Sequence, residues 1–296
     1  MSAAAATALV TGAAGMLGSQ LVRVAPGGWR ALGTDLAAGH GVSAAGIDLA
    51  DPAALERLFA EHGPFDGVLH CAAYTAVDRA EAEPERAQRV NVEAARALAS
   101  ACARAGVPLV LVSTDFVFDG EQREPYLEDA APRPLSVYGR TKLEGEERAL
   151  AAHPAGTAIV RTQWLYGPRG QHFPRTIVQR ARELGKLKVV HDQIGSPTST
   201  LELAPALWDV LLGGGRGRYH AVCAGTCSWF EFSLEILAQC GLRDIPVEPC
   251  SSAEFPRPAR RPAFSALGGE RLQRLRGRGL APWRAALRDY LREEPL

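Results

Sequence analysis

A tyrosine and a lysine lie four positions apart in this sequence, at Tyr138 and Lys142. In a helix this spacing places both side chains on one face. A free tyrosine titrates near ~10, and an ammonium group beside it stabilises the phenolate, so the hydroxyl exchanges protons more readily near neutral pH. Tyr138 is therefore a candidate general acid. The alternative is a surface helix with an ordinary aromatic residue and an exposed lysine, and spacing alone favours that alternative.

A glycine-rich turn near the start of the chain predicts a phosphate site. A short apolar run, the sequence TGAAGMLG at residues 11–18 and an amphipathic run follow one another, which predicts a strand, a turn and a helix. Gly12 permits the tight turn, Gly15 lets the backbone approach a pyrophosphate, and Gly18 lets the helix and strand pack closely. The free N–H groups at the start of the helix attract anionic oxygens.

Asp35 ends a second predicted strand, at about the position where the adenosine ribose of a dinucleotide is expected. Its carboxylate would accept hydrogen bonds from the ribose hydroxyls. An acid there repels a 2′-phosphate, and no arginine immediately follows, so the local chemistry favours NAD over NADP. The alternative is a simple turn aspartate.

Strands and helices alternate through the first half of the chain, which predicts an α/β fold with a doubly wound parallel sheet of the Rossmann type. In such a sheet, ligands bind at the carboxyl ends of the strands. This rule brings together STDF at 113–116, the helix that carries Tyr138, and TQWLY at 162–166. Further strands are expected at 47–49, 67–71, 108–112 and 159–161, and helices at 52–63, after the capping residue Asp51, and at 84–105.

Beyond residue 167 proline and glycine increase, and a smaller C-terminal α/β substrate lobe is expected. We assign residues 1–167 to a dinucleotide-binding domain and 168–296 to the lobe, with interleaved segments expected. The lobe holds a polar loop at 191–198 and a segment at 256–262 with three arginines among prolines. Arginine forks suit a diphosphate, and a solvated basic loop is the alternative. Helices are expected at 173–184, 201–212 and 229–240.

The composition limits the kinds of partner. The 296 residues include 33 basic and 33 acidic side chains, and the pI is near 7.1, so neither nucleic acid nor an anionic membrane is expected. We expect a small soluble substrate and a cytoplasmic protein. The six scattered cysteines resemble intracellular thiols and are expected to be reduced. His220, Cys223 and Cys227 lack the spacing of a zinc finger, and core packing is favoured for them.

With these motifs the chain resembles the extended short-chain dehydrogenase/reductases, and within them the dTDP-4-dehydrorhamnose reductase family. The resemblance covers nearly the whole chain. It implies reduction of a 4-keto nucleotide sugar by NADPH or NADH, the last step toward dTDP-L-rhamnose. The segments that carry it are AAYTAVD at 72–78, YGRTKLEG at 138–145, RTQWLY at 161–166, DQIGSPT at 192–198 and ARRP at 259–262.

The resemblance makes Thr114, Tyr138 and Lys142 the catalytic group. Thr114 would hydrogen-bond the substrate carbonyl oxygen, Tyr138 would donate its proton, and Lys142 would hold the nicotinamide ribose and tune Tyr138. The expected cofactor contacts are Gly12, Gly15, Met16, Leu17, Gly18, Asp35, Asp48, Leu49, Ala72, Ala73, Tyr138 and Lys142. The expected substrate contacts are Thr75, Val77, Thr114, Asp115, Phe116, Tyr138, Trp164 and Arg260.

One position separates the chain from related dehydratases, and two others depart from the pattern of the family. Related dehydratases carry an acidic pair after the threonine, whereas Phe116 takes the second place here, which disfavours dehydration. Members with a metal at a dimer interface have a glutamate where this chain has Gln20, so we predict no metal, and the oligomeric state, monomer or homodimer, stays open. His172 replaces a frequent asparagine, which leaves a contact with the sugar diphosphate at that position open.

Two other functions are compatible with the same resemblance. One is a non-catalytic binding subunit, because the regulatory β subunit of methionine adenosyltransferase is similar to this family; the intact Thr114, Tyr138 and Lys142 argue against it. The other is a nucleotide-sugar epimerase, which would keep and recycle its cofactor instead of consuming it.

Overall fold

Seven strands form one parallel sheet in the order β11-β6-β5-β4-β1-β2-β3. The computed structural model describes residues 5–296. The order reverses direction at β1, so successive crossovers run to opposite edges and the sheet is doubly wound, as the alternation of elements predicts. The strands are β1 (Ala6–Thr11), β2 (Trp29–Asp35), β3 (Ala44–Ala45), β4 (Gly67–His70), β5 (Leu109–Thr114), β6 (Thr157–Thr162) and β11 (Gly217–His220).

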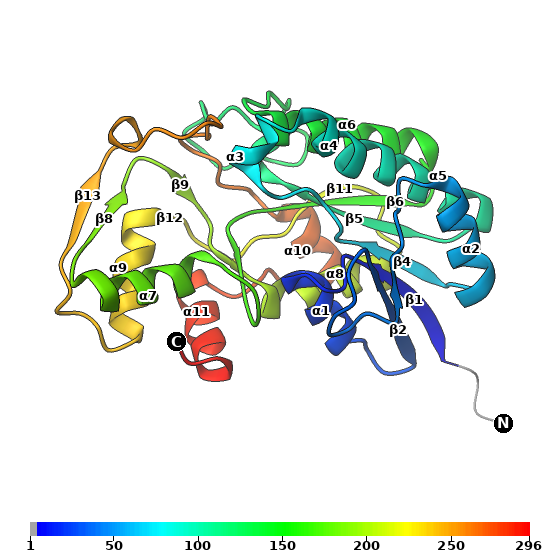
Figure 1. Cartoon of the computed structure of the whole chain (residues 1–296), viewed down its shortest axis with the longest axis horizontal. Coiled ribbons are helices and arrows are strands. Elements are labelled where there is room, and N and C mark those ends of the chain that lie inside the picture. The colour runs from blue at the N-terminus through cyan, green and yellow to red at the C-terminus, as the bar shows by residue number, and fades with distance from the viewer. Residues whose placement is uncertain (1–4) are drawn as a thin grey trace.

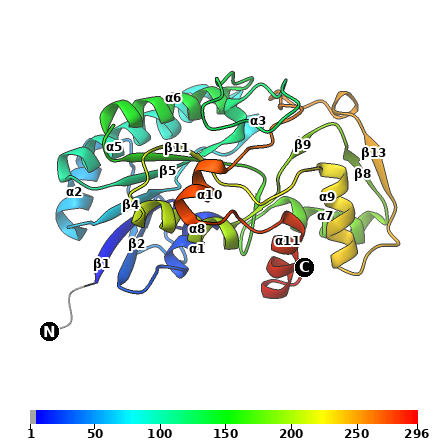
Figure 2. The ribbon, with the colours of Figure 1, turned by 180° about the vertical axis from the view of Figure 1, so that it is seen from behind.

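Helices cover both faces of this sheet (Figures 1 and 2). Because side chains alternate along a strand, Leu9 and Leu109 pack into one buried cluster, while Ala8 and Val110 pack into another. The first cluster includes residues of α2 (Pro52–His62), α5 (Ala94–Ala105) and α6 (Val137–Ala152), and the second includes residues of α1 (Met16–Arg23), α8 (Thr200–Leu212) and α10 (Glu270–Arg276). The continuous apolar strands of the sequence are thus explained by burial on two faces.

A smaller lobe lies beside the sheet, at the left of Figure 1. Two of its helices agree with the predicted ranges 173–184 and 229–240 to within one residue, because each starts at a capping side chain. Its third helix was not predicted. The polar loop at 191–198 is partly strand. The lobe contains α7 (Phe173–Leu184), α9 (Trp229–Gln239) and α11 (Trp283–Glu293), and three strand pairs, β7 (Leu165–Tyr166) with β10 (Thr198–Ser199), β8 (Leu187–Val190) with β13 (Val247–Cys250), and β9 (Ile194–Gly195) with β12 (Cys227–Ser228).

The helical run predicted at 84–105 is present, but it contains a π-helical turn at Arg89–Glu93 between α4 (Pro84–Gln88) and α5. Inside this turn the Asn91 amide accepts from the backbone N–H of Tyr74 at 2.9 Å and donates to the Thr141 hydroxyl at 3.0 Å. A Cβ on Gly145 of α6 would lie 2.2 Å from the Asn91 carbonyl oxygen. The turn therefore ties the chain before α3 (Val77–Ala80) to the helix that carries Tyr138.

The strand predicted at 47–49 is wrong. Strand β3 is shorter and earlier, and Gly46 ends it with a left-handed φ of 76°. Asp48 then accepts from the backbone N–H of Ala50 at 2.9 Å, which closes a turn in place of a ladder hydrogen bond. The apolar residues on either side of Asp48 suggested a strand because their alternation imitates one.

The sheet takes its edge strand β11 from beyond residue 167, where β11 pairs with β6 in parallel. The helices α8 and α10, also from beyond that point, cover one face of the same sheet. The division into residues 1–167 and 168–296 stays a prediction, and interleaving of its two parts is visible in β11.

Core packing explains the histidine and cysteines that were considered as a zinc site. Cys223 and Cys227 are buried in an apolar cluster, and His220 Nδ1 lies 2.9 Å from the Tyr126 carbonyl oxygen. The six cysteines are free thiols. Within residues 5–296, no helix has both the length and the apolar character needed to cross a membrane.

A buried ion pair fixes α6 on the sheet. Glu146 of α6 and Arg161 of β6 are 0% and 1% exposed, and their charged atoms lie 2.6 Å apart. The second oxygen of Glu146 accepts from Arg161 Nε at 2.9 Å and from the Ser113 hydroxyl at 2.5 Å. Because water cannot solvate an unpaired charge at this buried position, the charge of each residue is stabilised by the charge of the other.

We expect Glu146→Ala to lower the free energy of unfolding by about 3–5 kcal/mol, because it leaves the Arg161 guanidinium buried without its counter-charge. Urea denaturation of the purified chain measures this. The control is Glu270→Ala, which breaks a pair with Arg274 that is 61% and 75% exposed and should cost less than ~1 kcal/mol. Equal losses in the two variants would show that the buried pair does not hold α6.

Candidate active site

A cavity of about 520 Å³, called here the main cavity, opens at the carboxyl ends of β1, β4, β5 and β6. The position is the one expected for a ligand of a doubly wound sheet. It brings together residues from the glycine turn, from the end of β5, from α6 and from the segment after β6. Of the predicted contacts, those that line it are Gly12, Gly15, Met16, Leu17, Gly18, Ala73, Thr75, Val77, Thr114, Asp115, Phe116, Tyr138, Lys142 and Trp164.

The glycine turn at one end of the main cavity has no room for side chains. Gly12 has a φ of 68°, and a Cβ there would lie 2.6 Å from the backbone nitrogen of Ala72. A Cβ on Gly18 would lie 2.1 Å from the Gly12 carbonyl oxygen. Helix α1 starts after Gly15 with no side chain capping its free N–H groups. Bare backbone and an uncapped helix start suit the pyrophosphate of a dinucleotide, so the residues fit this cofactor.

Predicted adenosine contacts line a second, small cavity that also touches Gly12. Asp35 lies there and accepts from the backbone N–H of Ala14 at 3.0 Å, which ties it to the glycine turn. Asp48 also lines it, but its carboxylate is paired with Arg89 at 2.6 Å, and this hydrogen bond lowers the pKa of Asp48. Leu49 and Ala72 complete the predicted residues of this cavity. Direct contacts of these residues with a dinucleotide stay a prediction.

Tyr138 is held at the start of α6, where the Ser136 hydroxyl caps the backbone N–H of Gly139 at 3.1 Å. Its ring is 9% exposed and meets the Phe116 ring edge-on, with centroids 5.5 Å apart. A Cβ on Gly139 would lie 2.2 Å from the Phe116 carbonyl oxygen, so only glycine allows this close approach of α6 to the turn at Asp115–Val117.

Burial, more than the lysine, sets the acidity of Tyr138. Burial raises the pKa of Tyr138 to about 12, although the Thr114 hydroxyl beside it acts to lower the pKa and the Asp115 charge acts to raise it. Tyr138 is therefore less acidic than a free tyrosine, because burial removes water from around the phenolate. The effect expected of Lys142 on the phenolate as it forms stays a prediction. With this pKa, Tyr138 carries its proton at neutral pH, as a general acid requires.

Lys142 lies one helical turn along the same face of α6. Its ammonium group donates to the Val112 carbonyl oxygen at 2.8 Å. Burial lowers the pKa of Lys142 to about 8, and the charge of Glu146 opposes that change. The lysine is therefore still mostly protonated at neutral pH and can donate further hydrogen bonds into the main cavity.

Thr114 and Asp115 lie where β5 ends. The Thr114 hydroxyl accepts from the backbone N–H of Phe116 at 3.2 Å and donates to Asp115 Oδ1 at 3.1 Å. Asp115 Oδ2 accepts from the Ser265 hydroxyl at 2.6 Å and from the Gln163 amide at 3.3 Å. Asp115 is almost fully buried, which raises its pKa to about 6 despite these donors.

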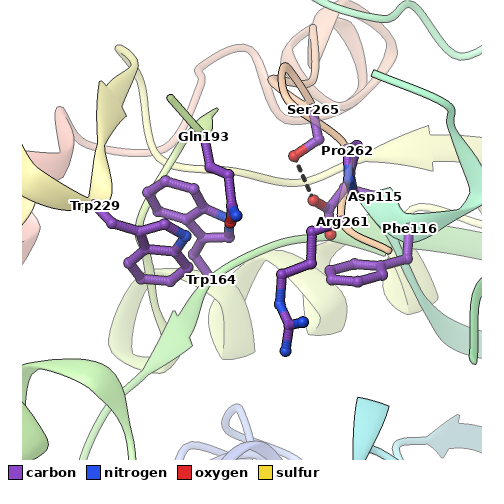
Figure 3. A pocket seen from close by; sticks show the side chains of 8 residues that line it. All are labelled: Asp115, Phe116, Trp164, Gln193, Trp229, Arg261, Pro262 and Ser265. Atoms are coloured by element: carbon purple, nitrogen blue, oxygen red, sulfur yellow. Dashed lines mark hydrogen bonds between the residues drawn. The ribbon is translucent and has the colours of Figure 1, made fainter. Parts of the chain in front are cut away.

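A third cavity of about 190 Å³, called here the tryptophan cavity, adjoins Asp115 and Phe116 (Figure 3). Trp164 and Trp229 stack at its wall, with ring centroids 3.6 Å apart and planes 12° apart. Trp164 has a left-handed φ of 48°, and a Cβ on Gly195 would lie 2.7 Å from its ring. Gly195 in the polar loop therefore leaves room for the Trp164 ring, which a larger residue would displace.

Arg261 projects between the tryptophan pair and Phe116 (Figure 3). Its guanidinium forms two hydrogen bonds with the carboxylate of Asp78, at 2.9 and 3.0 Å. Asp78 lies on α3, so this pair joins the segment at 256–262 to the short helix α3. The guanidinium lowers the pKa of Asp78, which keeps the pair charged.

One predicted contact, Arg260, lies elsewhere than expected, and the structure also shows the surroundings of His172, whose contact was left open. Arg260 is exposed and lines none of the three cavities, whereas its neighbour Arg261 lines the tryptophan cavity. His172 caps α7 through Nδ1, 3.4 Å from the backbone nitrogen of Arg175, and its Nε2 lies 3.0 Å from the Tyr290 hydroxyl. Both ring nitrogens are therefore engaged within the lobe.

Several lining residues were not among the predicted contacts. Gln163 lies in the segment at 162–166 that the sequence places after a strand, and Gln193 lies in the polar loop at 191–198, so these positions were the only indication that the two residues line the site. No sequence motif marks Trp229 or Ser265 as a site residue, because tertiary folding alone brings each of them to the cavity.

Comparison with known proteins agrees with this geometry. The family model described as "RmlD substrate binding domain" matches residues 6–295. The chain is similar to the probable dTDP-4,6-dihydroxy-2-methyloxan-3-one 4-ketoreductase of Streptomyces antibioticus, at 43% identity over 95% of this chain and 93% of that protein. It is also similar to the dTDP-4-dehydrorhamnose reductase of Mycobacterium tuberculosis H37Rv, at 41% identity over 96% and 91%.

A solved structure shows the same fold. The dTDP-4-dehydrorhamnose reductase of Bacillus anthracis, crystallised in complex with NADP, superposes with a TM-score of 0.90 at 34% identity. The match covers 97% of this chain and 99% of that chain.

We expect Gly18→Ala to weaken binding of the dinucleotide on the order of tenfold or more, because the added methyl group would push α1 away from the turn. Nicotinamide fluorescence on titration with NADPH and NADH measures the dissociation constants. The matched control is Gly27→Ala, where a Cβ would meet nothing within 4 Å. Unchanged affinity in the Gly18 variant would show that the turn does not hold the cofactor.

Proposed function

The chain belongs to the RmlD substrate binding domain family, and from this membership we propose that it reduces dTDP-4-dehydro-L-rhamnose to dTDP-L-rhamnose. The reaction is reduction of the 4-keto group of a nucleotide-linked deoxysugar, with NADPH or NADH as the cofactor. The relatives named above differ in the sugar that their names specify, and share a ketoreductase activity on a dTDP-linked sugar.

One observation carries the proposal: Thr114, Tyr138 and Lys142 line the same cavity as the glycine turn. A proton donor and a dinucleotide can therefore meet a substrate in one place. The cavity volume of about 520 Å³ lies within the range of small-molecule sites, roughly 300–1,000 Å³.

Each residue of the group has a separate task. The bound reduced nicotinamide supplies a hydride for C4 of the sugar. Tyr138, protonated because of its pKa of about 12, gives its proton to the oxygen that becomes the new hydroxyl, and Thr114 donates a hydrogen bond to the same oxygen. Lys142 holds the nicotinamide ribose, and its charge stabilises the phenolate as Tyr138 loses the proton.

The surroundings of Tyr138 favour reduction over dehydration. Phe116 packs edge-on against the phenol and puts an apolar ring where a second acid would be needed. Among residues 5–296, Asp115 carries the only carboxylate that lines the main cavity. A base to remove a proton from the sugar carbon is therefore missing among the side chains that face Tyr138.

The nucleotide part of the substrate has matching chemistry in the tryptophan cavity. The stacked pair of Trp164 and Trp229 offers a flat apolar surface, which suits a thymine or the sugar ring. Arg261 offers a planar fork of donors for the diphosphate, and its bond to Asp78 already orients it. We therefore assign to Arg261 the role that the sequence suggested for Arg260.

We expect the purified chain to oxidise NADPH or NADH when dTDP-4-dehydro-L-rhamnose is added, with dTDP-L-rhamnose as the product. The decrease in nicotinamide absorbance measures the rate, and chromatography identifies the sugar. An epimerase would change the sugar without net loss of reduced cofactor. Absence of turnover in protein that is shown to be folded and to bind cofactor would overturn the substrate assignment.

Replacing Tyr138 by Phe should lower kcat on the order of a hundredfold or more, because the proton donor is lost while the ring packing is kept. Cofactor affinity should remain as in the parent chain. The matched control is Tyr219→Phe on β11, whose hydroxyl only accepts from the backbone of Arg216. Equal kcat for the Tyr138 variant and the parent would remove Tyr138 from the catalytic group.

A further inference from the structure

The single proton of the Thr114 hydroxyl is already committed in this structure. A hydroxyl has one proton to donate and two lone pairs that accept. Thr114 accepts from the backbone N–H of Phe116 and donates to Asp115 Oδ1. Tyr138 lies beside the Thr114 hydroxyl on the side of the main cavity. With its proton on Asp115, Thr114 has one lone pair left on that side, and a lone pair repels a carbonyl oxygen. The arrangement thus opposes the hydrogen bond that the proposed reaction requires from Thr114.

The geometry points to Asp115 as a positioning residue that must be protonated for Thr114 to donate to the substrate oxygen. This inference rests on the proposed function. A proton on Asp115 Oδ1 reverses the hydrogen bond, so that the carboxylic acid donates to Thr114 Oγ. Thr114 then accepts from Asp115 and from Phe116, and its own proton is free for the substrate. All hydrogen-bonding positions of the hydroxyl are used in this form.

The other contacts of Asp115 determine which of its oxygens takes the proton. Ser265 donates to Oδ2 at 2.6 Å and Gln163 donates to the same oxygen at 3.3 Å. Gln163 also donates to the Ser265 carbonyl oxygen at 2.6 Å and accepts from the backbone N–H of Ser196. With two donors fixed on Oδ2, only Oδ1, which faces Thr114, remains free to carry the proton.

The surroundings allow both protonation states near neutral pH. The other charged or titratable side chains that share a cavity with Asp115 are Cys71, Tyr138 and Lys142 in the main cavity and Arg261 in the tryptophan cavity. Burial raises the pKa of Asp115 to about 6, and the hydrogen bonds from Ser265, Thr114 and Gln163 limit the increase. Since a protonated carboxyl is the active form, kcat/KM should fall as the pH rises through this value.

Asp115→Asn tests the inference, because an asparagine resembles a permanently protonated aspartate. The donors on Oδ2 require the amide oxygen there, so the NH₂ group faces Thr114 and donates to it. This variant should lose the fall in kcat/KM near pH 6, whereas Asp115→Ala should be slower at every pH by roughly tenfold or more, because nothing orients Thr114.

Ser265→Ala gives a second, independent readout. Ser265 stabilises the charged carboxylate, so its loss should raise the pKa of Asp115 and move the fall in kcat/KM upward by ~1 pH unit. Infrared difference spectra between the parent and Asp115→Asn, taken over the same pH series, follow the carboxylic acid band directly without substrate. The control is Ser100→Ala, whose hydroxyl donates to the backbone of Arg96 on α5, far from the site; its profile should match the parent.

The outcomes separate this inference from the proposed function. If the parent chain turns over the 4-keto sugar but Asp115→Asn is as slow as Asp115→Ala, or keeps the parental pH profile, the inference is overturned and the proposed function stands. An unshifted profile and an unshifted infrared titration in Ser265→Ala overturn it as well. If the parent shows no turnover, the proposed function fails, and the infrared titration alone decides whether Asp115 holds a proton near pH 6.

Discussion

The ion pair of Glu146 and Arg161 is almost completely buried, and the position of α6 on the sheet depends on it. Glu146 follows Lys142 and Tyr138 along one face of the helix at intervals of a turn. Anchoring Glu146 to β6 and to Ser113 of β5 therefore also fixes where the lysine and the phenol stand relative to the strand ends. Nearer the start of the helix, Gly139 lets α6 contact the turn after Thr114. Tight packing at Gly139 and at Glu146 thus fixes the position of Lys142, which lies between them.

Burial also shifts the pKa of three ionisable groups that line the main cavity. It raises the pKa of Tyr138 and Asp115 and lowers the pKa of Lys142, so each group is shifted toward its uncharged form. A neutral phenol is useful to a reaction that consumes a proton. Burial disfavours the charged form of Lys142, and the charge of Glu146 and the hydrogen bond to the Val112 carbonyl oxygen stabilise that form. Structural and chemical roles of Glu146 are therefore difficult to separate.

Local patterns in the sequence predicted correctly those parts of the fold that depend on interactions between residues close together in the chain. The glycine turn, the cap at Asp51 and the spacing of Tyr138 and Lys142 are set by neighbours a few residues away, and the structure places them as predicted. The strand predicted at 47–49 was wrong because Gly46 and Asp48 favour a turn over the alternation of their neighbours. The π-helical turn at Asn91 has no local signal, because it depends on the approach of Gly145. The sequence could not show which of the adjacent residues Arg260 and Arg261 contacts Asp78, because that contact depends on tertiary folding.

The strand β11 has a consequence for how such chains are recombined. It forms the edge of the sheet next to β6, although it follows α7 and α8 in the chain. A fragment that stopped before it would expose the hydrogen-bonding groups of β6 as an open edge, which invites pairing with other molecules. A hybrid made by joining the front of one relative to the rear of another would place a foreign strand beside β6. A hybrid therefore keeps its sheet intact only if β11, α8 and α10 come from the same parent as the strands that they contact.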